Sequence, residues 1–317
     1  MSNNPTRRKI GLIAMRALLA AELAVFLVIV TVWLYPQSLP AAIAIARQDS
    51  VCPLGDVWDG GPLRVLLSKE APRIREGSKL VETDEAGFEY WETPEGNYWV
   101  PKGSGQPLPF LLAQQSADQY GDGVQTVQPG DIALDAGAHV GIWTREALAR
   151  GASVVVAIEP APANLECIRR NLKDEIAAGK VIVYPKGIWD VEDSLPLWED
   201  PNNSAADNFF EKGGAVNSSN SIPLVPIDLL VKELGLDRVD VIKMDIKGAV
   251  TRALKGAEGT LEKFDPNLII ATEEFDDNPF MILALMETLA PGYRVNCSSC
   301  SIVEGLKLWP DVLLLSR

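Results

Sequence analysis

The segment Leu134-Asp-Ala-Gly-Ala-His-Val-Gly141 decides the fold, because a short apolar strand runs into it and a helical pattern follows it directly. Gly137 allows the backbone to turn sharply and to approach a ligand without a Cβ in the way. Gly141 allows the helix to pack closely on the strand, and the helix start offers unpaired N–H groups. A dinucleotide fingerprint reads G-x-G-x-x-G, whereas this segment reads D-x-G-x-x-x-G, so a pyrophosphate site is not indicated. The acid Asp135 at the strand end favours a cationic ligand that carries an amino acid.

A second acid stands at the end of the next strand. Residues 153–159 read Ser-Val-Val-Val-Ala-Ile-Glu, an apolar run typical of a strand that is buried on both faces, and Pro160 follows. In doubly wound folds an acid at this place hydrogen-bonds ribose hydroxyls. Asp135, Glu159 and the glycine loop between them therefore predict a nucleoside site at the topological switch point of the sheet. Two ordinary surface turns are the alternative interpretation.

Strands and helices alternate from residue 130 to the C-terminus. Apolar, β-branched runs predict strands at 132–135, 153–159, 180–184, 239–244, 268–273, 293–297 and 311–316. Helical patterns lie between them, at 141–150, 162–178, 226–234, 250–264 and 279–289. Residues 199–220 are rich in Asn, Ser, Gly and Asp, which predicts a long loop. The alternation predicts an α/β fold with a doubly wound, mostly parallel sheet covered by helices on both faces.

Composition divides the whole chain into five parts. We expect a basic tail (1–16), an apolar anchor (17–35), a linker rich in Pro, Gly and Ala (36–60), an extension (61–129) and the α/β domain (130–317). The extension carries a hairpin signal at 86–101, where aromatic and β-branched residues flank Pro-Glu-Gly-Asn, and a helical pattern after 107. The hairpin aromatics are expected to fill a core.

The apolar run Ala17–Tyr35 predicts a transmembrane helix. Its length suits the roughly 30 Å of hydrocarbon in a bilayer, and Trp33 and Tyr35 suit the membrane interface. Glu22 lies inside the run and counts against this interpretation. A cleaved signal peptide, with processing near Ala41–Ala46, is the alternative, but the run is longer than a usual signal core. We expect an uncleaved, single-pass membrane anchor.

Net charge narrows the range of partners. The chain of 317 residues carries a formal net charge of −14, and its Lys and Arg residues form no long run beyond the extreme N-terminus. Such a surface repels phosphate backbones, so we expect no nucleic-acid partner. A neutral or cationic small acceptor suits this field better.

The four cysteines leave several interpretations open. Cys167 lies in a helical pattern and is expected to be a small buried hydrophobe. Cys297 and Cys300 are spaced as C-x-x-C, which suits a dithiol, a disulfide, half of a metal site, or a loop with incidental cysteines. The chain has one histidine and no second C-x-x-C, so we expect no closed four-ligand zinc site and predict no metal.

From about Gly130 to Ile270 the chain resembles the FkbM-type methyltransferases, a branch of the class I S-adenosylmethionine-dependent enzymes. The segments that carry the resemblance are Leu134–Gly141, Ala157–Asn164, Arg169–Asn171 and Val241–Val250. The resemblance implies a seven-stranded sheet of the Rossmann-like kind. It also implies transfer of a methyl group to a hydroxyl of a sugar, a polyketide or a similar small or glycan acceptor.

The resemblance also implies roles for individual residues. The loop from Asp135 to Gly141 is expected to hold the methionine part of S-adenosylmethionine, and Glu159 with Pro160 its ribose. The segment Tyr184–Trp189, which includes Gly187, is expected to border the adenine. The predicted cofactor-binding residues of the glycine loop are Asp135, Gly137, Ala138, His139 and Gly141.

One part of the family pattern is altered. The family reads Lys-x-Asp-x-Glu-Gly-x-Glu after the fourth strand, whereas here Lys243 and Asp245 are kept and the two glutamates are replaced by Lys247 and Val250. We predict Asp245 as the base that accepts the proton of the hydroxyl, with Lys243 as its catalytic neighbour. A helix cap or strand-end hydrogen bond is the alternative role for Asp245. The replacements indicate either a different, anionic acceptor or a cofactor-binding scaffold that has lost activity.

The side of the membrane stays open. Arg7, Arg8 and Lys9 precede the apolar run, so the positive-inside rule places the α/β domain outside the cytoplasm. S-adenosylmethionine, however, is made and kept in the cytoplasm.

Overall fold

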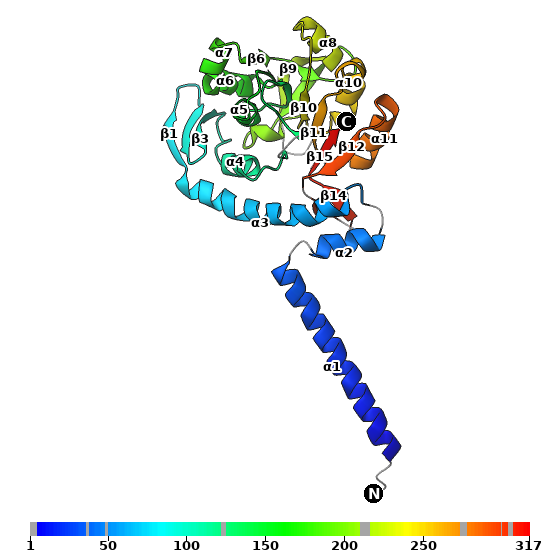
Figure 1. The fold of residues 1–317 in the computed structure, drawn as a ribbon. Helices are drawn as coiled ribbons and strands as arrows, with labels where there is room; N and C mark the ends of the chain where they lie inside the picture. The colour runs from blue at the N-terminus through cyan, green and yellow to red at the C-terminus, as the bar shows by residue number, and fades with distance from the viewer. Residues whose placement is uncertain are drawn as a thin grey trace.

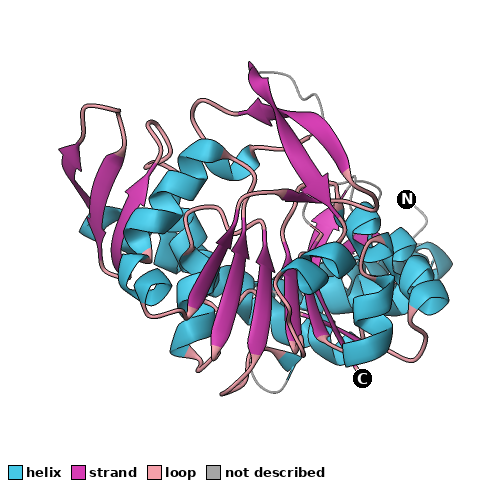
Figure 2. Cartoon of the chain, turned by 90° about the horizontal axis from the view of Figure 1, so that it is seen from above, coloured by secondary structure: helices cyan, strands magenta, loops and turns pink. Residues whose placement is uncertain are grey.

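The computed structural model describes residues 5–35, 38–47, 50–121, 125–209, 216–272, 278–298, 300–303 and 307–317. The α/β domain forms the rounded body in Figure 1, while helix α1 (Pro5–Leu34) extends away from it. Figure 2 shows the strands of a central sheet side by side, with helices on both sides of them.

A seven-stranded sheet forms the centre of the domain. Its strands are β4 (Ile132–Ala136), β5 (Val154–Ile158), β6 (Val181–Tyr184), β10 (Val241–Met244), β11 (Asn267–Ala271), β12 (Arg294–Cys297) and β15 (Val312–Ser316). They lie in the order β12-β15-β11-β10-β4-β5-β6. The run from β11 to β6 is parallel throughout, whereas β15 is antiparallel to both of its neighbours. The predicted seven-stranded, mostly parallel sheet is confirmed.

Alternate residues of the strands face two separate cores. Leu134, Val156 and Ile242 belong to the larger core, while Ala133 and Val155 belong to a core on the other face. Because neighbouring side chains of a strand point to opposite faces, apolar strands without alternation need helices on both sides. The helices provide this cover, which confirms the doubly wound arrangement.

The helices of the domain follow the predicted positions, with two breaks. They are α5 (Ile142–Ala149), α6 (Pro162–Asn171), α7 (Lys173–Ala177), α8 (Ile227–Glu233), α9 (Val250–Lys255), α10 (Glu258–Phe264) and α11 (Pro279–Leu289). The pattern at 162–178 divides at Leu172, and the pattern at 250–264 divides at Gly256. A Cβ on Gly256 would lie 2.2 Å from the carbonyl oxygen of Trp189, so close backbone packing requires glycine there.

The linker prediction for residues 36–60 is wrong. Helix α2 (Ser38–Arg47) and the first turns of α3 (Leu54–Gly77) occupy most of this range. Ile43 and Ala44 of α2 are buried in the larger core, together with Val57 of α3. Burial of one apolar helix face against the domain therefore outweighs the loop-like Pro and Gly content, as tertiary context often does. The boundary between linker and extension at residue 60 also falls inside α3.

The predicted single-helix membrane span is not shown by the structure. Among the described residues, no one helix is both long and apolar enough to cross a bilayer, whereas Leu18–Leu34 and Ser38–Ala46 meet the criterion as a bent pair. Helix α1 also begins before the expected anchor, at Pro5, so residues 5–16 of the predicted basic tail belong to the same helix.

The extension packs its hairpin onto the domain. Strands β2 (Glu89–Thr93) and β3 (Gly96–Val100) form the predicted hairpin, and β1 (Lys79–Thr83) adds a third antiparallel strand. Tyr98 and Val100 are buried in a core with residues of α4 (Leu108–Ser116), α5 and α6, so the hairpin aromatics fill a core as expected.

Two further small sheets are formed by segments for which the sequence predicts no strands. The first joins β7 (Gly187–Ile188), β8 (Asp193–Glu199) and β9 (Val216–Val225), and the short helix η2 (Ser204–Ala206) follows β8. The predicted loop over 199–220 is therefore shorter than expected. The second sheet joins β13 (Cys300–Val303) to β14 (Lys307–Pro310).

Of the alternatives left open for Cys297 and Cys300, a disulfide between these two residues is not formed. Cys297 forms a disulfide with Cys52, which precedes α3, and Cys300 lies beside this bond. No pattern in the sequence places Cys52 beside the C-terminal strands, because the packing of α2 and α3 against the domain depends on distant residues. Cys167 is fully buried, as expected.

Candidate functional site

A cavity of about 250 Å³ lies at the carboxyl ends of β4, β5 and β10. This is the switch point of the sheet, where β4 has β5 on one side and β10 on the other. Parallel register sets Asp135 opposite both Lys243 and Ala157, so the ends of the three strands meet at one edge. Helix α4, the loop after β8 and the short strand β7 supply the remaining walls.

The glycine loop passes very close to β10. Gly137 has a φ of +78°, and a Cβ there would lie 2.1 Å from the carbonyl oxygen of Asp245. Only glycine can occupy this position without moving the backbone. The amides of Gly137 and Ala138 both donate to the carbonyl oxygen of Ile158, which ties the loop to the end of β5. His139 follows with a φ of +53°, a left-handed conformation that is uncommon outside glycine.

Glu159 forms the floor of the cavity on the β5 side. It is 4% exposed and accepts hydrogen bonds from the backbone amides of His139 (2.8 Å) and Ala161 (2.9 Å). The side-chain amide of Asn164 donates to it at 3.3 Å. Burial raises the pKa of Glu159 to about 7, although these donors oppose the shift. A further hydrogen-bond donor or a positive charge in the cavity would therefore stabilise the ionised form of Glu159.

Asp135 lies beneath the wall of the cavity. Its carboxylate is fully buried and accepts hydrogen bonds from the Lys243 ammonium (3.0 Å) and the Thr144 hydroxyl (2.7 Å). The same ammonium donates to the carbonyl oxygen of Gly137 at 2.9 Å. A buried charge needs a partner of this kind. Asp135 and Lys243 thus hold the glycine loop in place, and Lys243 also lines the cavity.

Asp245 and Lys247 form an ion pair on the β10 side of the cavity. The Lys247 ammonium lies 3.0 Å from one carboxylate oxygen of Asp245, and the Tyr120 hydroxyl donates to the other at 3.0 Å. Burial alone would raise the pKa of Asp245, but the charges of Lys247 and Lys243 outweigh it and lower the pKa to about 2. Asp245 is consequently ionised at neutral pH, yet it is a weak base.

Val250 has no part in this arrangement. It begins helix α9 and is fully buried in the larger core, where it contributes apolar packing. Of the two altered family positions, only Lys247 therefore places a new charge in the cavity wall.

The wall opposite the sheet comes from the loop after β8. The imidazole Nε2 of His139 lies 2.8 Å from the Ser204 hydroxyl. Burial, aided by the charge of Lys243, lowers the pKa of His139 to about 3, so the ring is neutral at physiological pH. Asp207 also lines the cavity, and burial raises its pKa to about 8.

Most of the predicted site residues come together. The cavity is lined by Gly137, Ala138, His139, Glu159, Pro160, Gly187, Lys243 and Asp245. Asp135 lies behind the wall, and Gly141 directly precedes α5 with a φ of +89°, where a Cβ would lie 2.7 Å from a methyl carbon of Leu172. Gly141 thus serves packing, and Gly187 is confined by Leu224 in the same way.

Lys186, in the segment Tyr184–Trp189 expected at the site, also lines the cavity. The sequence predicts no site role for several other lining residues, which are Tyr120, Asn164, Ser204 and Asp207, with Phe110, Leu111, Gln114 and Gln115 around helix α4. Residues 203–209, within the segment that the sequence predicts as a long loop, also line the cavity. The lining includes residues of α4 and none of the hairpin. An uncharged helix remote in sequence gives no pattern by which its place at the site could be recognised.

The strand order and the cavity at the switch point are those of a doubly wound α/β fold with a candidate ligand site at the carboxyl ends of its strands. The chain belongs to the methyltransferase FkbM domain family, whose model matches residues 135–295, just over half of its length. It is accordingly a methyltransferase, and the predicted family is confirmed.

Individual known proteins are similar to parts of this chain. Methyltransferase sdnD from Sordaria araneosa is 25% identical over 183 residues, which cover 49% of this chain and 71% of that protein. The crystal structure of methyltransferase FkbM from Methylobacillus flagellatus KT is 18% identical, with a TM-score of 0.44, covering 82% of this chain and 61% of that one. A candidate methyltransferase from Streptococcus mutans, in complex with SAH, is 12% identical with a TM-score of 0.37, covering 61% of this chain and 91% of that one.

Proposed function

We propose that this methyltransferase uses S-adenosylmethionine and methylates a hydroxyl group of a sugar or of another small or glycan acceptor. The family supports methyl transfer, and the chemistry of the cavity supports this cofactor. The observation that carries the proposal is a buried acceptor without a partner. Asn164 lines the cavity, and its Oδ1 is buried without a hydrogen-bond partner among the described residues. Such an atom costs about 1–3 kcal/mol, which a ligand hydroxyl would recover.

Glu159 and Asn164 together suit the two hydroxyls of a ribose. Asn164 is 1% exposed and turns its amide nitrogen toward Glu159, which leaves its oxygen for a donor. Asp207 adds a third acceptor in the opposite wall. A ligand that brings several hydroxyls and a positive charge would satisfy this set of acceptors. A phosphate would not, because both Glu159 and Asp207 repel an anion when ionised.

S-adenosylmethionine supplies, when bound, an electrophilic methyl group on a positively charged sulfur. The chain has to position the acceptor and exclude water. Tyr120 and helix α4 form an apolar and amide-bearing wall beside Asp245, and this wall suits the acceptor better than the Glu159 side does. Asp245 would take the proton of the hydroxyl, and Lys247 weakens it in that role.

The ion pair of Asp245 with Lys247 favours a second candidate, a cofactor-binding protein with weak or no activity. In this alternative the cavity binds S-adenosylmethionine, but Asp245 remains paired and accepts no proton. The two candidates differ in the effect of Lys247→Glu, which restores the family residue. The proposed enzyme loses its fit to its own acceptor, whereas an inactive copy has no transfer to lose.

Calorimetric titration of the full chain with S-adenosylmethionine and S-adenosylhomocysteine tests the cofactor site. We expect micromolar binding of both, weakened in Glu159→Ala by ~1.5–3 kcal/mol because charge-assisted hydrogen bonds are lost. Glu192→Ala is a control, since Glu192 is exposed and outside the cavity. Absence of binding by folded protein, or unchanged affinity in Glu159→Ala, would refute the assignment. Transfer of labelled methyl groups to glycan or lipid extracts then tests the acceptor class.

We also propose that the N-terminal helix α1 anchors the protein in a membrane. The apolar side chains of α1 are turned away from the protein: Leu18, Leu23 and Phe26 are 58–64% exposed. Helix α1 also stands clear of the domain (Figure 1). An unpaired apolar surface of this extent is typical of a membrane contact.

A further inference from the structure

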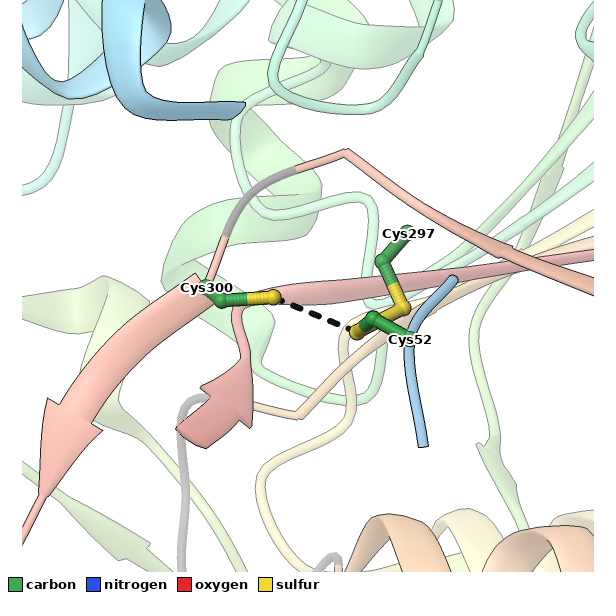
Figure 3. Close-up of side chains that lie close together, drawn as sticks. All are labelled: Cys52, Cys297 and Cys300. Atoms are coloured by element: carbon green, nitrogen blue, oxygen red, sulfur yellow. Dashed lines mark hydrogen bonds between the residues drawn. A yellow bond between two sulfur atoms is a disulfide. The ribbon is translucent and has the colours of Figure 1, made fainter. Parts of the chain in front are cut away.

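The three cysteines Cys52, Cys297 and Cys300 gather their sulfur atoms at one buried point, remote from the cavity. The sulfurs lie within 4.8 Å of one another, and all three residues are 5–6% exposed. Figure 3 shows the disulfide between Cys52 and Cys297, with the thiol of Cys300 donating to the Cys52 sulfur at 3.2 Å. The three residues come from the segment before α3, the end of β12 and the start of β13.

We propose that the reduced form of this cluster, Cys52, Cys297 and Cys300, binds one zinc ion through three thiolates. Zinc prefers thiolate ligands at about 2.3 Å in a tetrahedral arrangement, which sets the sulfurs about 3.8 Å apart. The Cys300 sulfur is already near this distance from Cys52. The Cα atoms of Cys52 and Cys297 are 5.7 Å apart, so rotation of the side chains suffices to separate their sulfurs.

The hydrogen bonds around the three cysteines hold their segments in place, as a metal site requires. The Asp56 carboxylate accepts a hydrogen bond from the Cys297 amide at 2.7 Å and one from the Asn296 side chain at 3.1 Å, which fixes β12 against α3. Ser298, between the two cysteines of the C-x-x-C turn, has a buried hydroxyl without a hydrogen-bond partner among the described residues. A negatively charged three-thiolate centre would offer an acceptor to a donor in this turn.

Reduction of the disulfide precedes binding of the metal. A dithiol reductant gives two electrons and two protons to the Cys52–Cys297 disulfide, which becomes two thiols. Zinc then replaces the protons of all three thiols and releases three protons. Within the part of the chain that the structure describes, no further His, Cys, Asp or Glu joins this group of ligand atoms, so the fourth position of the metal is left to water or another small ligand. The disulfide and the zinc site are thus alternative states of the same sulfurs, and each joins α3 to the C-terminal strands.

Metal titration of the full chain in detergent tests the proposal. Protein reduced with a dithiol and freed of reductant under anaerobic conditions is titrated with Co²⁺ and then with Zn²⁺. We expect one equivalent of Co²⁺ with thiolate-to-cobalt absorption, displaced by one equivalent of Zn²⁺. Cys300→Ser is expected to lower zinc affinity by about 100-fold or more, because one of few ligands is lost. Cys167→Ala is the matched control, since this buried thiol lies in another core.

A second measurement covers a variant that fails to fold. In the reduced wild-type protein, zinc should protect three cysteines from alkylation under native conditions, as read by mass spectrometry of peptides. The proposal is overturned if the reduced chain binds no stoichiometric zinc, if bound zinc leaves the three thiols reactive, or if Cys300→Ser binds zinc as tightly as the wild type. Persistence of the Cys52–Cys297 disulfide in strong reductant would overturn it as well.

Discussion

At the scale of single residues, Glu159 links the pH of the solution to the state of the site. Its folded pKa, raised by burial to about 7, lies above the ordinary value of 4.5. The neutral form is thus favoured in the folded chain. The contribution of Glu159 to the free energy of unfolding is complete below about pH 4.5 and is lost as the pH rises through about 7. Asp207 acts with the same sign, because its pKa is raised to about 8.

We therefore predict that ionisation of Glu159 lowers the free energy of unfolding of the ligand-free protein by about 3 kcal/mol at most between pH 4.5 and 7.5. Urea unfolding of the wild type and of Glu159→Gln across this range measures the effect, and the variant should show a shallower decline. Binding of S-adenosylhomocysteine should strengthen over the same interval, since ribose hydroxyls donate to the ionised carboxylate. Identical pH slopes in the two proteins would contradict the prediction.

The effect of Asp245 on stability has the opposite dependence on pH. Its pKa is lowered from 3.8 to about 2, so its ion pair stabilises the fold above about pH 4 and loses this effect as the pH falls through about 2. Asp245→Asn should lower the free energy of unfolding by about 2 kcal/mol at pH 7 and by nearly nothing near pH 2. Asparagine keeps an oxygen for the Tyr120 hydroxyl, so the substitution isolates the charge.

Lys247→Met supplies the matching partner for Asp245→Asn. If the two charges stabilise one another, the double variant should lose less stability than the sum of the single variants. Additive losses in denaturant unfolding at pH 7 would mean that the ion pair contributes little. In Lys247→Met the carboxyl of Asp245 should also titrate at higher pH, which carboxyl-carbon NMR can follow.

At the scale of elements, Arg170 connects the hairpin to helix α6. Its guanidinium lies between the rings of Phe88 (4.6 Å) and Trp99 (4.7 Å) and forms ion pairs with Asp84 and Glu166. Arg170→Ala should cost about 1–2 kcal/mol from the two cation–π contacts. The melting temperature should fall by about 2–6 °C. Arg169→Ala is the control, because Arg169 is exposed on the same helix; an equal shift in both variants would refute the prediction.

The elements that were predictable are those in which local pattern and tertiary burial agree. Strands such as 153–159 are apolar throughout because both faces are covered, and the glycine loop is marked by a backbone that no other residue fits. The sequence of α2 resembles a linker because its burial depends on packing against α3 and against β13 and β14, which lie more than two hundred residues away. The α4 wall of the cavity was missed for the same reason, since Gln114 and Phe110 carry no chemical signature.

The residues of the candidate site differ in the same way in how far the sequence predicts them. Residues that a strand end or a tight turn fixes, such as Glu159 and Gly137, were placed from the sequence. The effect of Lys247 on Asp245 was not, because a charge replacement seen in sequence does not reveal whether the new ammonium faces a ligand or a neighbouring carboxylate. The structure shows that it meets the carboxylate, at 3.0 Å.

At the scale of the whole molecule, the disulfide and the anchor raise one question about compartment. The basic residues before the apolar run indicate a domain outside the cytoplasm, where disulfides persist. The proposed cofactor and the proposed zinc state both indicate the reducing side. The state of Cys52 in cells therefore reports on which side the domain lies.

The anchor itself can be tested apart from that question. We predict that the full chain sediments with membranes and stays there in high salt and at alkaline pH, because an apolar helix is held by burial in hydrocarbon and not by charge. A variant that begins at Ser38 should be released, while keeping affinity for S-adenosylhomocysteine. Charge reversal of Arg7, Arg8 and Lys9 is the control and should leave the full chain membrane-bound. Full-length protein in a high-salt soluble fraction would refute the anchor, and a mature N-terminus near residues 41–46 would establish a cleaved signal peptide in its place.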